Sequence, residues 1–168
     1  QTLDAQFQGA SPLPNSILAP GHLHLSHGLA QIEFFCGASL LIEGGTHLEI
    51  LSPWEARCHS GRLRAHVPPA AKGFLLHTPT LKVEDLGTEF ALNVSPEDTA
   101  LHVFEGEVIA HPPNAAATSL TEGMSYRGHA PASSPNPQDF LPIADLRSQL
   151  QTHAAERFAD WQSWHQQH

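Results

Sequence analysis

The sequence predicts an all-β fold with short strands stacked in two layers, and three observations lead to this prediction. Apolar residues alternate with polar ones in short runs between Leu23 and Val108, and a period of two is typical of strands with one buried face. Glycines punctuate the runs, as tight turns and bulges require. From Gly28 to Val67 the runs follow one another without a long crossover. The predicted strands include residues 23–25, 30–34, 40–42, 48–50, 63–67, 74–76, 81–83, 90–94, 101–103 and the region of 108.

Two architectures fit this pattern. One is a sandwich of two sheets, and the other is a short solenoid in which consecutive strands stack into two facing layers. The runs between Gly28 and Val67 are similar in length, which favours the solenoid-like version, although no repeat of fixed spacing supports it. We therefore expect a β body that is solenoid-like or sandwich-like.

The composition changes after the last of these strands. Residues 111–138 are rich in Pro, Ala, Asn and Ser, which indicates a linker or strap that buries little surface. Within it, residues 120–126 are interpreted as a last hairpin-like piece. We divide the chain into an N-terminal extension (1–20), a β domain (21–127), a Pro-rich linker (128–141) and a C-terminal helix (142–168) that leads to a domain outside this chain.

The last segment has a helical period. Apolar side chains recur in steps of about four from Leu146 to Trp161, and Trp164 follows, as in an amphipathic helix. The two tryptophans suggest either a sugar-stacking pair or the aromatic side of a helix packed on the β body or on a following domain. The second arrangement is the commoner one.

Charge and hydropathy exclude several classes of function. The chain has 17 acidic and 8 basic side chains, and its few Arg and Lys residues form no dense stripe, so nucleic-acid binding is not expected. No apolar run reaches the roughly 18 residues that span a bilayer. Because the chain begins at Gln1 without a signal-like segment, we expect a piece of a longer protein whose membrane anchor lies outside these residues.

The sequence contains no recognisable catalytic motif. It has no Gly-x-Ser-x-Gly, His-Glu-x-x-His or phosphate-binding Gly-x-x-x-x-Gly-Lys pattern, so we predict no enzyme and no cofactor. His22 and His24 share one strand face and are a weak candidate for metal chelation, but no third ligand follows from the spacing, so we predict no metal. His165 and His168 form a second weak pair at helical spacing.

The two cysteines, Cys36 and Cys58, both lie beside turns. In an oxidising compartment they are candidates for a disulfide. The alternative is that both are small, partly buried thiols with no redox or nucleophilic role.

The sharpest motif is Asp-Leu-Gly-Thr-Glu-Phe at residues 85–90. An Asp two residues before a Gly accepts backbone N–H bonds across a turn, and the Thr hydroxyl adds a further donor. The role that we predict for Asp85 is therefore structural. The alternative places Asp85 or Glu89 on a surface that faces a partner.

Four blocks follow one another along the chain, at residues 73–74, 78–79, 85–90 and 104–108. In this order and at these intervals they resemble the extracytoplasmic domain of FecR-type regulators, so that residues 21–127 are interpreted as a FecR-like β domain. Further similarity lies at residues 28–38 and 61–68, so the resemblance spans about residues 21–109. The motif residues, which we expect to be mainly structural, are Gly73, Phe74, Pro79, Asp85, Leu86, Gly87, Thr88, Glu89, Phe90, Phe104, Glu105 and Gly106.

The resemblance implies a non-catalytic, periplasmic or cell-surface sensor domain of a membrane-anchored bacterial protein. Such an anti-sigma factor relays an envelope signal to an extracytoplasmic-function sigma factor through a cytoplasmic segment outside this chain. An outer-membrane transporter's signalling domain is a further partner that the resemblance implies. Because an open sheet edge accepts a strand from a partner, we expect docking at an edge. Either Lys82 and Glu84 or Arg62 and Arg64 are interpreted as charges that protect an edge from stray pairing.

A second and shorter resemblance concerns residues 157–164, which are similar to the segment leading into a laminin-G-like (concanavalin-like lectin) domain in some large FecR-domain proteins. It implies an alternative function. The chain would then be a structural spacer or glycan-associated module of a surface protein, with glycan bound by a domain downstream of His168.

Overall fold

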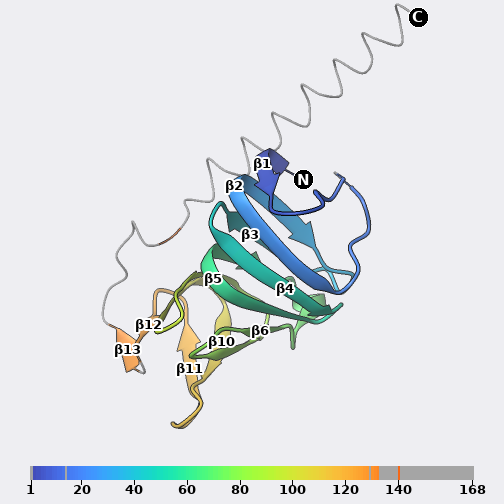
Figure 1. Ribbon diagram of the computed structural model, residues 1–168. Helices are drawn as coiled ribbons and strands as arrows, with labels where there is room; N and C mark the ends of the chain where they lie inside the picture. The colour runs from blue at the N-terminus through green and yellow to red at the C-terminus, as the bar shows by residue number, and fades with distance from the viewer. Residues whose placement is uncertain (1, 14, 129, 133–139, 141–168) are drawn as a thin grey trace, which may run out of the picture.

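The computed structural model describes residues 2–13, 15–128, 130–132 and 140, and they form an almost purely β structure (Figure 1). A single 3-10 turn, η1 (Pro69–Ala71), interrupts the strands in this part of the chain. The strands are β1 (Thr2–Phe7), β2 (Gly21–Glu33), β3 (Ser39–Glu43), β4 (Thr46–Ser52), β5 (Glu55–His66), β6 (Leu75–His77), β7 (Lys82–Asp85), β8 (Glu89–Val94), β9 (Thr99–Glu105), β10 (Glu107–His111), β11 (Thr118–Thr121), β12 (Ser125–Arg127) and β13 (Ala130–Ala132).

Three long antiparallel segments form the centre of the fold: β2, β3 continuing into β4, and β5. The C-terminal halves of β2 and β5 pair with β3, and their N-terminal halves pair with β4. The segments bend where β2 and β5 change partner from β3 to β4, and Gly28, Gly44 and Gly61 lie at this point. A Cβ on Gly44 would lie 2.8 Å from the Cα of His27, and a Cβ on Gly61 would collide with Thr46. The bend therefore requires residues without a side chain.

The bend gives the sheet two layers. The first layer contains the C-terminal halves of β2 and β5 with β3, and continues from β5 through β8, β9, β12 and β13. The second layer contains the N-terminal halves of β2 and β5 with β4, and continues from β5 through β6, β7, β10 and β11. Among the described pairs, β5 with β6 is the one parallel pair.

Both layers turn their apolar side chains into one core. The buried positions on β5 are Ala56 and Cys58 before the bend and Leu63 and Ala65 after it, so the inward positions change from even to odd numbers. A bulge causes this change, because one extra residue reverses the faces of a strand. The largest fully buried side chains are Phe74, Phe90, Leu25, Leu40, Ile42, Leu48, Leu63, Leu76, Leu92, Leu101 and Leu120.

The all-β, two-layer prediction is confirmed. The antiparallel order fits the sandwich-like description better than the solenoid-like one that the strand lengths favoured, since stacked coils of a solenoid would pair in parallel. The hairpin predicted at residues 120–126 is wrong: β11 pairs with β10 and β12 pairs with β9, so the turn between them joins the two layers. Two strands, β1 and β13, lie in segments for which the sequence analysis predicted an extension and a linker.

The helix predicted for residues 142–168 lies outside the described residues, and so do Trp161, Trp164, His165 and His168. No helix with the length and apolarity of a bilayer crossing occurs in the part of the chain that the structure describes.

The predicted charge protection of edges is wrong. Arg62 and Arg64 lie on β5, between β3 and β8, and Lys82 and Glu84 lie on β7, between β6 and β10.

Candidate functional site

The Asp85 turn, residues 85–90, connects β7 to β8 between the two layers. The side chain of Asp85 is fully buried. Its Oδ1 accepts a hydrogen bond from the backbone N–H of Gly87 at 2.5 Å, and its Oδ2 accepts one from the hydroxyl of Thr88. These contacts and the burial of Asp85 are consistent with a structural role, which stays a prediction.

Burial makes the carboxyl of Asp85 less acidic than usual. Loss of hydration raises its pKa to about 6, although the hydrogen bonds from Thr88 and Gly87 act in the opposite direction. Asp85 is thus mostly ionised at neutral pH and protonated in mild acid.

A second block of the motif, at residues 104–108, packs directly on this turn. Gly106 has a φ of +84°, and a Cβ there would collide with the carbonyl oxygen of Gly87 and lie 3.0 Å from Cγ2 of Thr88. The backbone N–H of Leu86 donates to the carbonyl oxygen of Glu107 at 3.1 Å, and the Thr88 hydroxyl, which donates to Asp85, also lies 3.2 Å from this oxygen. The two blocks of the motif therefore hold each other in place.

Glu89 links the Asp85 turn to the outer face of the first layer. Arg64 donates to Glu89 from Nη2 at 3.1 Å, and its guanidinium carbon lies 3.6 Å from the ring centre of Phe104. The Arg64 side chain is only 10% exposed. Phe140 lies buried on the same face, against Ala91 and Ala100. Glu89 thus forms its main contact, with Arg64, within the domain.

The remaining motif residues are placed as follows. Phe74 and Phe90 belong to the core, Leu86 is half-buried, and Gly73, Pro79 and Glu105 are exposed in or beside turns. Gly73 donates its N–H to the carbonyl oxygen of Asp85 at 2.8 Å. Most of the motif therefore surrounds a single turn.

The two cysteines are free thiols in this structure. Cys58 is fully buried in β5, where burial raises the pKa of its thiol to about 12. Cys36 is half-buried in the turn after β2 and packs against the core. The environment of Cys58 therefore does not favour a thiolate. The disulfide stays a prediction.

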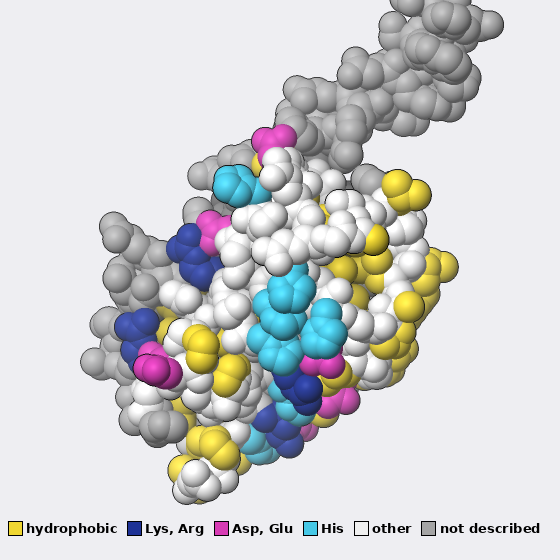
Figure 2. All heavy atoms as spheres, viewed as in Figure 1, with side chains coloured by type: hydrophobic (Ala, Val, Ile, Leu, Met, Phe, Trp, Pro, Cys, Tyr) yellow, Lys and Arg dark blue, Asp and Glu magenta, His cyan; other side chains and the backbone are white. Residues whose placement is uncertain are grey.

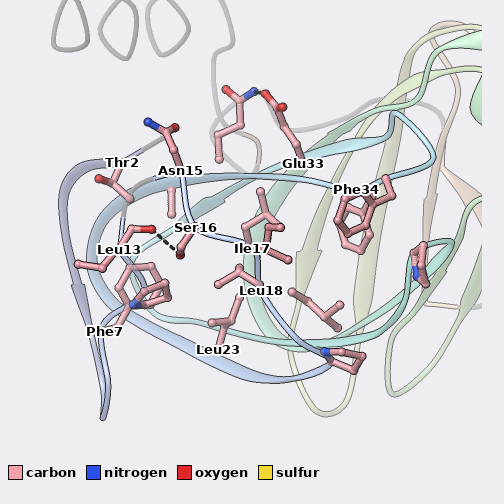
Figure 3. Close-up of a pocket in the computed structure, with 18 of the residues that line it drawn as sticks. Thr2, Phe7, Leu13, Asn15, Ser16, Ile17, Leu18, Leu23, Glu33 and Phe34 are labelled. Atoms are coloured by element: carbon pink, nitrogen blue, oxygen red, sulfur yellow. Dashed lines mark hydrogen bonds between the residues drawn. The ribbon is translucent and has the colours of Figure 1, made fainter. Parts of the chain in front are cut away.

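A pocket of about 510 Å³ lies where the N-terminal segment crosses β2 (Figure 3). Phe7, Leu18, Leu23 and Phe34 are among the side chains that line it, and the lining is largely apolar. Glu33 is the one ionisable residue that lines it among the described residues, and it accepts a hydrogen bond from Gln31 at 3.2 Å. Such a lining suits apolar contact rather than acid–base chemistry.

Three large apolar side chains around this pocket are exposed to solvent. Leu13 is 76% exposed, Ile17 is 81% exposed and Phe35 is 80% exposed, and all three line the pocket. Beside them, β1 pairs with β2 alone among the described strands, so its other edge is open. The sequence analysis missed this site because it treated residues 1–20 as an extension, although Leu3, Ala5 and Phe7 alternate with polar residues.

Comparisons with known proteins agree with this architecture. A putative anti-sigma factor from Parabacteroides distasonis, solved at 2.50 and 1.65 Å resolution, is similar in fold, with a TM-score of 0.57 and 17% sequence identity. The similarity covers 64% of this chain and 54% of that one, so the chain spans about half the length of its structural relative. A comparison with curated proteins gave no match.

The family assignment rests on the segment that forms the bent sheet. The model of the family described as FecR protein matches residues 26–109, which is half of the chain. The matched segment runs from the bend in β2 to β10 and includes the Asp85 turn and the Gly106 turn. The chain belongs to the FecR family.

Proposed function

We propose that this chain is a non-catalytic, extracytoplasmic sensor domain of a membrane-anchored regulator, which relays an envelope signal to an extracytoplasmic-function sigma factor through protein–protein contacts. The observation that carries the proposal is the match of the FecR model to the bent sheet, residues 26–109. The name of the structural relative, a putative anti-sigma factor, is consistent with it. Contact with the sigma factor would involve a cytoplasmic segment outside this chain.

The open edge of β1 supports docking of a partner protein. Residues Thr2 to Phe7 pair with β2 on one side, in a register that shifts twice. Backbone N–H and C=O groups on the other side are free to pair with an added strand, which is a common mode of peptide recognition. We propose that an extended segment of the partner, such as one from an outer-membrane transporter's signalling domain, adds to this edge.

The pocket beside β1 supplies the apolar part of this docking site. A partner strand along β1 would run past the exposed side chains of Leu13 and Ile17. Alternate side chains of an added strand point to one face, so its apolar side chains would reach the pocket. Solvent exposure of large apolar side chains in one place is typical of an interaction surface.

The test is cross-linking of the full-length parent in its native envelope, followed by purification through a tag and identification of the partners by mass spectrometry. Three forms are compared: wild type, the pocket variant Ile17→Asp, and Met124→Asp as a matched control. Met124 is also an exposed apolar residue, 37% accessible, but lies in the turn between β11 and β12. We expect wild type and Met124→Asp to recover a sigma factor and a transporter, and Ile17→Asp to lose the transporter.

Two results would contradict the proposal. Recovery of polysaccharide and cell-wall material alone, with no sigma factor despite an intact cytoplasmic segment, would favour the alternative of a structural spacer next to a lectin-like domain. Equal recovery of the transporter by Ile17→Asp and Met124→Asp would overturn the docking site at β1 and leave the sensor function in place.

A further inference from the structure

Four histidines from three strands meet on the outer face of the second layer. They are His22 and His24 on β2, His47 on β4 and His59 on β5, and we call them the histidine cluster. Figure 2 shows histidine side chains gathered in one group on this face, with acidic and basic side chains at its border. The register between β2 and β4 explains how His22, His24 and His47 meet, because His24 lies opposite His47 and His22 lies opposite Glu49.

A bulge in β5 brings the fourth histidine to this face. His47 is paired with Ser60, whereas the next residue, Leu48, is paired with Cys58, so His59 is the extra residue on β5. Cys58 points into the core, and the half-buried His59 lies beside His47. The bulge that lets β5 turn from one layer to the other thus also places an imidazole in the cluster.

The rings are close enough to share one ion. Nδ1 of His22 lies 2.9 Å from Nε2 of His47, and the rings of His47 and His59 are stacked with centroids 4.3 Å apart. One ring nitrogen from each of His22, His47 and His59 lies within 4.8 Å of the other two. Ligand nitrogens around a tetrahedral Zn²⁺ are about 3.3 Å apart, because each Zn–N bond is about 2.0–2.1 Å. Small side-chain rotations would therefore bring all three rings into coordinating positions.

Glu49 provides the carboxylate that histidine metal sites commonly contain. Its Oε2 lies 3.0 Å from Nε2 of His59 and 3.2 Å from Nη1 of Arg57, and its Oε1 lies 3.8 Å from Nε2 of His22. A carboxylate beside a ligating histidine orients the ring and makes it a better ligand. Glu49 is also close enough to serve as a fourth ligand after a side-chain rotation.

The electrostatic environment of His47, the central ring of the histidine cluster, favours its neutral form. Burial lowers the pKa of His47, and repulsion from His24, His59 and His22 lowers it further, while Glu49 acts in the opposite direction. A neutral imidazole is the form that coordinates a metal. Without an ion, neighbouring rings repel as soon as two of them are protonated.

We propose that His22, His47 and His59 form a binding site for a divalent transition-metal ion of the Zn²⁺ class, with Glu49 as orienting carboxylate or fourth ligand. Imidazole nitrogens favour Zn²⁺, Ni²⁺ and Cu²⁺ over Ca²⁺ and Mg²⁺, which prefer oxygen. The ion joins β2, β4 and β5 across the outer face, so it stabilises the three long strands against separation. The site is independent of the proposed docking edge.

The test is a titration of the metal-stripped chain with ZnCl₂, followed by calorimetry. The protein is made without a polyhistidine tag, and all samples carry His165→Gln and His168→Gln to remove the other histidine pair. The variants are His47→Gln, His22→Gln, Glu49→Gln and the control His111→Gln. His111 also lies on a strand beside a glutamate, Glu84 at 3.0 Å, but outside the cluster. Titration with Co²⁺ reports the coordination geometry through its visible absorption.

We expect one Zn²⁺ per chain, with absorption typical of four-coordinate Co²⁺. Glu49→Gln should weaken binding by about 10- to 100-fold, as loss of an orienting carboxylate does in other sites. His47→Gln and His22→Gln should weaken it at least as much, and His111→Gln should leave it unchanged. Zn²⁺ should also raise the unfolding temperature of the control but not that of His22→Gln.

Two outcomes would overturn the site: no saturable binding of Zn²⁺ to the stripped chain, or equal Zn²⁺ affinity of His22→Gln and His111→Gln, whether both affinities are unchanged or both are reduced. His22→Gln should fold like the wild type, because the side chain of His22 is 55% exposed and does not belong to the core. A loss of Zn²⁺ binding in this variant therefore reports on the site and not on misfolding. Circular dichroism of each variant in chelator verifies that the fold is retained.

Discussion

The Asp85 turn and the histidine cluster are both polar groups on one sheet, but they differ in how their polar atoms are satisfied. Asp85 is fully buried, and its two oxygens are bonded to Gly87 and Thr88, which are two and three residues away in the sequence. The members of the histidine cluster are partly exposed and come from three strands.

From this difference we expect the conspicuous motif around Asp85 to contribute to stability rather than to binding. Short-range bonds need particular residues at particular spacings, so they leave a readable pattern. A surface cluster assembled by strand register leaves no pattern in the sequence. Substitutions in the motif should therefore reduce stability, and substitutions on the exposed faces should change binding at almost constant stability.

The largest effect is expected at Gly106. Gly106→Ala should lower the free energy of unfolding by about 3 kcal/mol or more, because the new Cβ collides with Gly87 and the positive φ is strained. Gly123→Ala is the matched control, since Gly123 has a φ of +80° but no atom within 4 Å of an added Cβ. It should cost about 1 kcal/mol. Urea unfolding of both variants measures the difference, and equal losses would show that the packing of the two motif blocks contributes nothing.

The next effect is a pH dependence that arises from Asp85. Its pKa is raised from 3.8 to about 6 in the folded state, so the folded protein holds this proton more tightly than the unfolded chain. The resulting stability is fully present below about pH 4 and is lost as the pH rises through about 6. Wild type should therefore gain about 2 kcal/mol relative to Asp85→Asn between pH 7 and pH 4. Chemical denaturation at several pH values tests this, and parallel curves for the two proteins would contradict it.

A smaller effect is expected where the motif meets the outer face. Arg64→Lys should lower the free energy of unfolding by about 1 kcal/mol, because lysine loses the fork that reaches Glu89 and the flat stacking on Phe104. Arg127→Lys is the control: Arg127 pairs with Asp98 at 3.4 Å, and its side chain is 53% exposed. That change should cost less than about 0.5 kcal/mol. Thermal unfolding of both variants measures the two losses of stability. A larger loss in Arg127→Lys than in Arg64→Lys would contradict the contribution assigned to the contacts of Arg64 with Glu89 and Phe104.

The smallest effect on stability is expected at the pocket beside β1. Ile17→Ser should change the free energy of unfolding by less than about 0.5 kcal/mol, because the side chain is 81% exposed. Denaturant unfolding of the purified domain gives the value. A loss comparable to that of Arg64→Lys would mean that Ile17 holds the N-terminal segment in place, and that the segment is structural rather than a docking surface.

Much of the fold was predictable because its signals are local. The period of two identified the strands between β2 and β10, and the Asp-x-Gly-Thr pattern identified a turn whose bonds involve near neighbours. β1 was missed although Leu3, Ala5 and Phe7 alternate with polar residues, because the run is short and stands apart from the other strands; its pairing with β2, with two register shifts, could not be predicted. The pairing of β11 and β12 with different strands was also unpredictable, because a turn does not reveal whether the strands beside it share a layer.

The candidate sites show the same division. His22 and His24 were recognised as sharing a strand face, but the third ligand depends on the register between β4 and β5 and on the bulge at His59. The sequence by itself determined the all-β class, the Asp85 turn and membership of the FecR family, because each depends on neighbouring residues. Tertiary structure alone decided the bend, the open edge and the meeting of the histidines, because pairing between distant strands is set by packing of the whole core.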